Sequence, residues 1–179
     1  MEKTINSEII STALKYLGEE EVLGNLGFKD DDFERKMKAV GWKEKEAWCA
    51  YFAELIWKEA YQRWDATLFT RLDRLFTGSA VNTFMNFQKT KDFIVTTKPV
   101  VGSLAVWQKY TDGKAHWTGH IGIVESFDIK NREVTTIDGN TNDKGSREGY
   151  IVARQLRPID FTLKQNGLNL LGFIHPQQI

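Results

Sequence analysis

The chain has 179 residues, which is enough for one domain with a substantial core and too few for two domains of ordinary size. A composition that is 41% hydrophobic, 27% charged and 12% aromatic is that of a folded globular protein, which excludes disordered and fibrous classes. Because 24 basic residues balance 24 acidic ones, the basic excess that attracts nucleic acids or anionic membranes is missing, and we expect neither as a partner.

The N-terminal segment has apolar residues at intervals of three and four, which predicts a helix that Asn6 or Ser7 caps and Gly18 ends. It has no apolar stretch behind a basic start and no small-residue cleavage site, so we expect no signal peptide. No segment approaches the roughly 18 apolar residues of a membrane span. We therefore expect synthesis in the cytoplasm, and action on a cell wall only after delivery by a phage lysis system or specialised secretion.

Two more helices are expected in the first half. Residues 30–32 are aspartates, and carboxylates favour a helix start ahead of Phe33; the alternative, a metal site, needs alternate spacing and a glycine turn. Gly41 ends this helix. A longer helix from about Trp48 to about Trp64 has an apolar stripe formed by Cys49, Phe52, Ala53, Ile56 and Ala60.

Residues 63–89 have a mixed pattern that predicts no single type of element. Ser79 is a candidate cap for a short helix through Met85. Beyond Lys91 the sequence changes to short β-branched or aromatic segments, which predict strands at 93–97, 103–110, 120–127, 132–138, 149–157 and 168–174. Helices first and strands later predict one α+β domain over residues 1–179. Its mainly helical part, 1–90, would pack on an antiparallel sheet of about five to six strands within 91–179.

Cys49 is the one cysteine of the chain, which excludes an internal disulfide framework and any metal site of several cysteines. Its position in the first turn of a predicted helix places backbone N–H groups and the positive end of the helix dipole beside the sulfur, as suits a nucleophile. The alternative is a structural role, because free cysteines are commonly buried and this one lies on the apolar stripe.

Three histidines are candidates for the base that such a thiol needs. His120 opens an apolar strand directly after Gly119, where its ring can face a groove, and it is the preferred base. His116 lies in a segment expected to be a flexible loop and is better placed to touch substrate, whereas His175 is expected to be structural. A mixed metal site of cysteine, histidine and aspartate competes for these residues, but only His116 and His120 have metal-ligand spacing.

Asp138 and Asn140 are the candidates for holding the imidazole of His120 in one orientation. Being two residues apart, both would lie on one face of an extended strand, and Gly139 between them permits a bulge or a close approach. A hairpin turning through residues 130–133 would bring Asp138 near His120. The alternative is a simple turn, because the segment is also typical of a loop that ends a strand.

Four segments together resemble the CHAP family, the cysteine, histidine-dependent amidohydrolases/peptidases, which belong with the NlpC-type papain-like peptidases. EAWCAYF, containing Cys49, resembles the nucleophile segment, and TGHIGIVES is similar to the histidine strand. VVGSLAVWQ resembles the family's Pro-Gly-Asp-Leu strand, with Val101 and Ser103 in place of the proline and the aspartate. TTIDGNTN resembles the following strand, with Asp138 in place of the usual glutamate.

The resemblance implies a papain-like cysteine peptidase fold and cleavage of amide bonds in bacterial peptidoglycan, as a stem-peptide endopeptidase or an N-acetylmuramoyl-L-alanine amidase. Cys49 would be the nucleophile and His120 the general base and acid. Asp138 and Asn140 would orient the His120 imidazole or polarise the reacting groups. The resemblance leaves open which of the two is the main partner of His120. The calcium-binding acidic loop of some family members has no counterpart before Cys49, so we expect no cofactor and no metal.

Side chains that flank the proposed site are candidates for holding sugar rings and stem peptides. These substrate-binding candidates are Trp48, Trp107, His116 and Trp117, and the alternative for each tryptophan is a place in the core. Two other functions stay open: a catalytically silent CHAP-like module that binds the wall or a protein partner, and a cysteine amidase acting on an amide outside the wall. We expect a monomer, with a delivery or immunity protein as a candidate partner.

Overall fold

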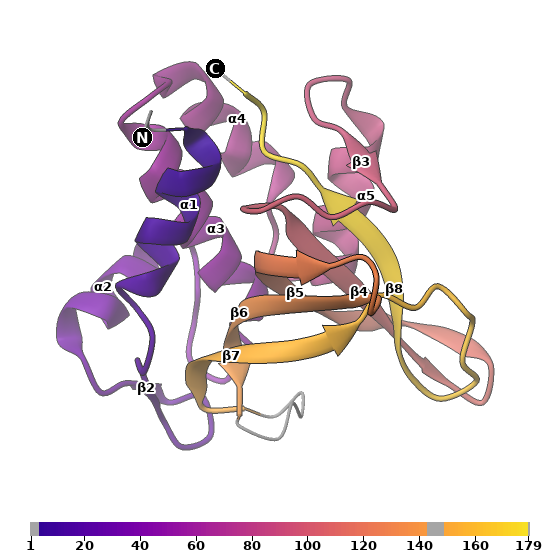
Figure 1. Ribbon diagram of the computed structural model, residues 1–179. Coiled ribbons are helices and arrows are strands. Elements are labelled where there is room, and N and C mark those ends of the chain that lie inside the picture. Colours follow the sequence, from indigo (N-terminus) through magenta and orange to yellow (C-terminus); the bar gives the residue numbers. More distant parts are fainter. Residues whose placement is uncertain (1–3, 143–148, 179) are drawn as a thin grey trace.

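The computed structural model describes residues 4–142 and 149–178. Within these residues, five helices in the first half of the chain are followed by a six-stranded antiparallel sheet (Figure 1). The prediction of an α+β fold with helices first and strands later is confirmed, and the arrangement is that of a papain-like domain.

The helices are α1 (Ile5–Leu14), α2 (Asp31–Ala39), α3 (Cys49–Gln62), α4 (Ala66–Leu75) and α5 (Ala80–Lys89). Asp30 and Ser79 cap α2 and α5 as predicted, because each side chain accepts a hydrogen bond from a first-turn N–H. The predicted cap of α1 is wrong: Thr4 caps this helix and accepts from the Ser7 N–H, so the helix begins before Asn6. Helix α4, capped by Asp65, lies in the segment that the sequence left as mixed.

The sheet has the strand order β3-β8-β4-β5-β6-β7, with every neighbouring pair antiparallel. Its strands are β3 (Val95–Thr96), β4 (Leu104–Thr111), β5 (Lys114–Asp128), β6 (Glu133–Thr141), β7 (Ile151–Pro158) and β8 (Gly167–Ile174). All six predicted strands are present. A separate two-stranded hairpin, β1 (Glu21–Val22) and β2 (Gly27–Phe28), was not predicted, because two-residue strands carry no alternation that could identify them.

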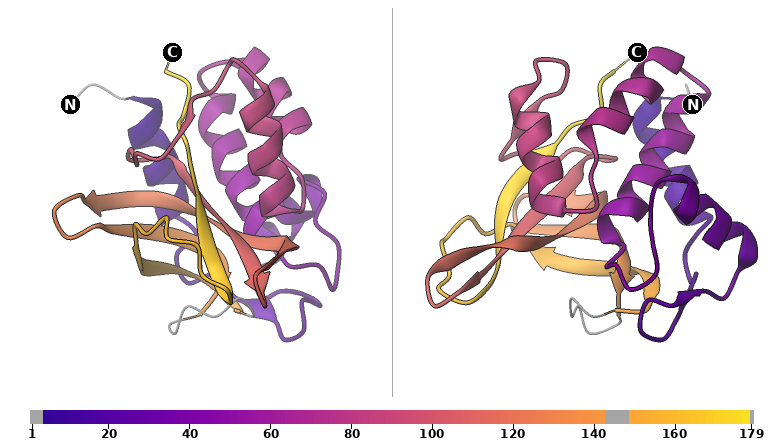
Figure 2. Two further views of the ribbon diagram at one scale, coloured as in Figure 1. Left: turned by 90° about the vertical axis from the view of Figure 1, so that its right-hand side faces the viewer. Right: turned by 180° about the vertical axis from the view of Figure 1, so that it is seen from behind.

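The helices cover one face of the sheet (Figure 2). Helix α3 contacts β5 and β6, α5 contacts β4 and β5, and α1 packs against α3. Trp57 of α3 is fully buried, and its ring centroid lies 5.9 Å from that of Phe76, 5.8 Å from that of Phe87 and 6.0 Å from that of Phe93. This aromatic contact fixes α3, and therefore the position of its first residue, Cys49, against the sheet.

Strand β6 passes very close to the start of α3 at Gly139. A Cβ atom added at Gly139 would lie 2.7 Å from Phe52 Cβ and 2.7 Å from Trp48 Cζ3. Only a residue without a side chain fits between the strand and the helix. The close approach predicted at this glycine is confirmed, and it places Asp138 and Asn140 beside the N-terminus of α3.

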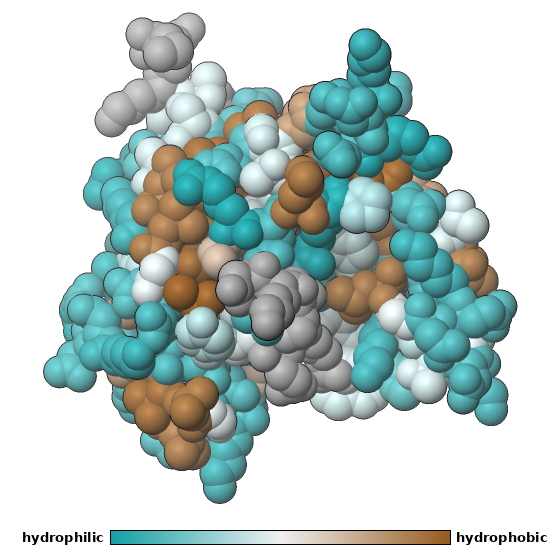
Figure 3. All heavy atoms as spheres, turned by 60° about the horizontal axis from the view of Figure 1, so that its bottom comes forward, coloured by the Kyte–Doolittle hydropathy of each residue, from teal (hydrophilic) through white to brown (hydrophobic). Residues whose placement is uncertain are grey.

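In the described part of the chain, no helix combines the length and the apolar character needed to cross a membrane. On the face that Figure 3 shows, hydrophobic residues form separate patches between hydrophilic ones. The most exposed large apolar side chain is Leu23, at 80%, in the turn between β1 and β2. Scattered apolar residues of this kind are ordinary on a protein surface.

Candidate active site

Cys49 is the first residue of α3, and the residue before it anchors the helix start. Trp48 is the N-cap but provides no side-chain hydrogen bond to the helix, so first-turn N–H groups are left uncapped by its side chain. Its indole is fully buried and donates from Nε1 to Glu21 Oε2 at 2.6 Å. The Cys49 side chain is thereby held at the positive end of a fixed helix, with 7% of its residue surface exposed.

His120 on β5 and Asp138 on β6 form a buried pair. His120 Nε2 lies 2.7 Å from Asp138 Oδ2, and the residues are 2% and 0% exposed. The Cys49 side chain is close enough to the His120 imidazole to raise the pKa of His120. Because Asp138 holds Nε2, the nitrogen that serves the sulfur is Nδ1. The predicted β5–β6 hairpin is confirmed by the pairing of Asp128 with Glu133, and it produces a continuous chain of contacts from thiol to imidazole to carboxylate.

Gly122 makes room for this pair. It lies two residues after His120 on the same face of β5, and a Cβ atom added to it would overlap Asp138 Oδ1 and come within 3.1 Å of Thr136 Cβ. The carboxylate of Asp138 therefore occupies the space that a side chain at this position would fill.

Arg157 on β7 binds the same carboxylate, a contact that was not predicted from the sequence. Its Nη2 and Nε donate to Asp138 Oδ2 at 2.7 and 3.2 Å. Its guanidinium carbon lies 5.0 Å from the ring centroid of Trp107 on β4, and that ring lies 6.1 Å from the ring of His120. An arginine on a strand after the one that carries Asp138 is only a weak indication of a contact with this carboxylate, because arginines at such positions are more often solvent-exposed.

The charges of the pair stabilise each other. Burial disfavours a charged imidazole, but the Asp138 carboxylate and the Cys49 side chain outweigh this effect and raise the pKa of His120 to about 9. Burial also opposes ionisation of Asp138, yet His120, Arg157 and Thr136 together hold its pKa below the ordinary value. At neutral pH the site therefore holds an aspartate and an imidazolium, with the Cys49 side chain close to the latter.

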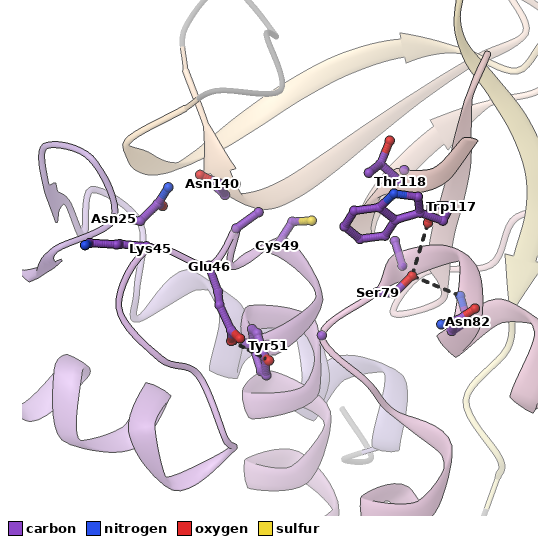
Figure 4. A pocket seen from close by; sticks show the side chains of 14 residues that line it. Asn25, Lys45, Glu46, Cys49, Tyr51, Ser79, Asn82, Trp117, Thr118 and Asn140 are labelled. Atoms are coloured by element: carbon purple, nitrogen blue, oxygen red, sulfur yellow. Dashed lines mark hydrogen bonds between the residues drawn. The ribbon is translucent and has the colours of Figure 1, made fainter. Parts of the chain in front are cut away.

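A pocket of about 510 Å³ opens beside Cys49. In Figure 4, Asn140 lies on one side of Cys49 and Trp117 on the other, and the sulfur points toward Trp117 and Thr118. The Trp117 carbonyl accepts a hydrogen bond from the Ser79 hydroxyl at 3.3 Å, which ties this part of β5 to the start of α5. Cys49 thus faces a groove with an aromatic wall at one end and polar groups at the other.

Comparison with known proteins agrees with this geometry. The family model for the CHAP domain matches residues 40–140, more than half of the chain. The protein belongs to the CHAP domain family. The matched segment contains Cys49, His120, Asp138 and Asn140. The CHAP family, named for cysteine, histidine-dependent amidohydrolases/peptidases, is in general a family of hydrolases.

The fold of this CHAP domain is similar to that in the crystal structure of Ly7917. The two align with a TM-score of 0.52 and 20% sequence identity, over 98% of this chain and 63% of that chain. The chain thus spans less than two thirds of the length of that protein, and the likeness concerns the fold alone. A comparison with curated protein sequences gave no match.

The CHAP domain brings several of the predicted site residues together. Cys49, His120 and Asp138 lie together, and Asp138, not Asn140, is the hydrogen-bond partner of His120. Asn140 lines the pocket with Cys49, but its φ of 51° is left-handed. The extended face predicted for Asp138 and Asn140 is therefore interrupted, at a β-bulge where the β6–β7 register shifts.

The substrate-binding candidates separate into two groups. Trp117 is 75% exposed and lines the pocket, so its predicted role stays open to test. Trp48 and Trp107 are 0% and 4% exposed, which corrects the idea that they form walls for substrate. His116 is exposed and lies within β5 rather than in a flexible loop, because the strand already begins at Lys114.

The third histidine, His175, has its hydrogen-bond partner outside the site. His175 Nε2 lies 2.7 Å from the Lys98 carbonyl oxygen, which fits its predicted structural role. The aspartates at 30–32 also have local partners: Asp30 caps α2 through the Phe33 N–H, and Asp32 pairs with Arg35 and Lys36. The capping interpretation is confirmed for Asp30.

Stability of the CHAP domain should fall as pH rises through the His120 titration. The pKa of His120 is raised from 6.5 to about 9, so its stabilising effect is complete below pH 6.5 and disappears by about pH 9. We expect a loss of about 2 to 3 kcal/mol in the free energy of unfolding across this range, measured by urea denaturation.

A His120→Gln variant is the control for this titration. Burial raises the pKa of Glu54 to about 7. Ionisation of Glu54 therefore also lowers the free energy of unfolding as pH rises, but only up to about pH 7. The decline between pH 7 and 9 should therefore vanish in the variant. An equal decline in both proteins would contradict the assigned pKa of His120.

Replacing Trp48 by phenylalanine tests its place in the core. The change removes the indole N–H that donates to Glu21. Because Glu21 is only 6% exposed, the loss of this hydrogen-bond partner should cost about 2 to 4 kcal/mol of stability. We expect KM to stay unchanged, because the indole does not reach the pocket. A raised KM with unchanged stability would restore the substrate-binding interpretation.

Proposed function

We propose that this protein hydrolyses amide bonds in bacterial peptidoglycan, as a stem-peptide endopeptidase or an N-acetylmuramoyl-L-alanine amidase. The observation that carries the proposal is the buried contact chain from Cys49 through His120 to Asp138, which ends at a pocket lined by Cys49 itself. Membership of the CHAP domain family supports the reaction class. We further propose that residues 1–179 form one catalytic domain that acts as a monomer.

In the proposed reaction, Cys49 is the nucleophile. With the thiol proton on His120, the sulfur attacks the amide carbonyl, and the carbonyl oxygen becomes an oxyanion that first-turn N–H groups of α3 can stabilise. The C–N bond then breaks as His120 gives its proton to the leaving amine, which leaves an acyl group on the sulfur. His120 next takes a proton from water, the hydroxide attacks the thioester, and the acid product leaves with Cys49 regenerated.

The other residues of the site have supporting roles in this proposal. Asp138 keeps the imidazole in the tautomer that presents Nδ1 to the sulfur and stabilises the imidazolium. Asn140, at the polar end of the pocket, would polarise or position the scissile amide. Trp117 would hold a sugar ring or a stem peptide at the other end, where its exposed indole faces the pocket. The mechanism uses no cofactor and no metal ion.

Purified sacculi provide the direct test of the proposed function. The wild-type protein should release soluble muropeptides or free stem peptides, and mass spectrometry of the new termini identifies the bond that is cut. The matched control is His120→Gln, which keeps a similar buried side chain but cannot carry the proton. We expect it to release no fragments above background.

Two outcomes would replace this proposal. Binding to sacculi without release of fragments by the wild-type protein would indicate a catalytically silent wall-binding module. Neither binding nor release, combined with rapid alkylation of Cys49, would indicate an amidase whose substrate lies outside the wall. A delivery or immunity partner stays a prediction that pull-down from the producing cell can address.

A further inference from the structure

Three nitrogen atoms of two basic side chains share one oxygen atom of Asp138. Asp138 Oδ2 is contacted by His120 Nε2 at 2.7 Å, by Arg157 Nη2 at 2.7 Å and by Arg157 Nε at 3.2 Å. The carboxylate is fully buried, and the arginine side chain is only 13% exposed. Charge-assisted hydrogen bonds at such burial are strong and directional, so the guanidinium restricts where Asp138 can point.

Arg157 is itself held in place by an aromatic ring. Its guanidinium lies over Trp107, at 5.0 Å from the ring centroid, and Trp107 is almost completely buried. The four side chains come from four adjacent strands, β4, β5, β6 and β7, so the sheet itself sets their spacing. Trp107 therefore belongs to a support for the catalytic pair instead of a wall for substrate.

The reaction explains why such a support matters. When His120 gives its proton to the leaving amine, Asp138 loses the cation that balances its charge. A buried carboxylate without a counter-charge is costly, and on its own it would resist this step by holding the proton on the imidazole. An arginine stays protonated throughout, so Arg157 balances Asp138 in both states of His120.

We propose that Arg157 is a positioning residue of the catalytic centre, which keeps Asp138 ionised and aimed at His120 throughout the proton-transfer cycle. Trp107 supports it by fixing the plane of the guanidinium. The catalytic part of this inference rests on the proposed amide hydrolysis. Its electrostatic part concerns His120 and Asp138 alone and can be measured without any substrate.

The experiment compares Arg157→Met and Arg157→Lys with a matched control on the same strand. Arg154 also binds a carboxylate on β5 with two hydrogen bonds, of 2.7 and 2.8 Å to Glu125, but this ion pair is exposed and lies outside the pocket. Arg154→Met therefore removes an equivalent surface ion pair. Thermal unfolding of all three variants establishes that each is folded.

The first readout is the titration of the His120 imidazole by NMR. The groups facing it are Cys49 on α3 and Asp138 on β6, with Arg157 behind Asp138. Removing a positive charge from this cluster favours proton binding, so Arg157→Met should raise the pKa of His120 by about one unit or more. Arg157→Lys should restore most of the wild-type value, and Arg154→Met should leave it unchanged.

The second readout is the pH profile of amide hydrolysis. For Arg157→Met we expect kcat to fall roughly tenfold to a hundredfold, with little change in KM and a basic limb displaced to higher pH. A His120 titration and a kcat that match the wild type in Arg157→Met would overturn the inference. Equal effects in Arg154→Met would overturn it as well, and if Arg157→Met does not fold, the same comparisons are made with Arg157→Gln, which also removes the positive charge. A displaced titration without any wall hydrolysis would reject the proposed substrate while keeping the electrostatic role of Arg157.

Discussion

Cys49→Ser should lower amide hydrolysis by roughly a thousandfold or more while the protein stays folded. Serine is nearly the same size as cysteine, so the packing at the start of α3 is preserved. An alcohol, however, ionises far less readily than a thiol, and the contacts around His120 are arranged for sulfur. The measurement is the initial rate of product release, with the melting temperature of each variant recorded alongside.

The wild-type thiol offers an independent control for this variant. Since Cys49 is the only cysteine in the chain, iodoacetamide can add only one carbamidomethyl group to a thiol, and intact-mass spectrometry follows its addition directly. His120→Gln should slow this alkylation at neutral pH, because the imidazolium no longer contacts the sulfur. Hydrolysis by Cys49→Ser at more than a tenth of the wild-type rate would exclude Cys49 as the nucleophile.

Gly122→Val should abolish most of the activity without touching any reacting group. A Cβ atom at this position overlaps Asp138 Oδ1, and the branched valine side chain adds further atoms in the same space. The carboxylate must turn away from His120, which removes the support of the imidazole. We expect a loss of roughly 10² to 10⁴ in kcat and a loss of about 1 to 3 kcal/mol in stability, measured by hydrolysis and urea unfolding.

A double-mutant cycle with Asp138→Ala separates crowding from catalysis. Removing the carboxylate makes room for valine, so the double variant should recover stability relative to Gly122→Val and remain as inactive as Asp138→Ala. Strictly additive losses of stability would show that Gly122 and Asp138 do not compete for space. The backbone itself should accept the change, because Gly122 does not have the positive φ seen at other glycines of the chain.

That Cys49, His120 and Asp138 lie together could be predicted because each has a local signature. Cys49 begins a helix with an apolar stripe, His120 begins the apolar part of β5, and Asp138 lies on the strand that returns beside it. Arg157 could not be found in this way. Its contact with Asp138 depends on which strand follows β6 in the sheet and on the β6–β7 register, and neither is encoded within a short stretch of sequence.

The errors in the sequence interpretation have the same origin. Trp48 is next to the nucleophile in the chain, yet as the N-cap of α3 it turns inward to Glu21. Trp107 lies on β4, on the strand next to His120, and only the position of Arg157 reveals what its ring does. His116 follows a tight turn at 112–113, and the polar residues around it resemble a loop although they form the start of β5.

The division of the site between the two halves of the chain has a consequence for biosynthesis. The nucleophile leaves the ribosome long before its base, since Cys49 opens α3 and His120 lies on β5. Asp138 and Arg157 follow later still, on strands that can pair only after β5 has formed. A partly synthesised chain therefore contains the thiol but lacks the imidazolium that assists it. The proposed activity would therefore reach its full level only once β7 has joined the sheet.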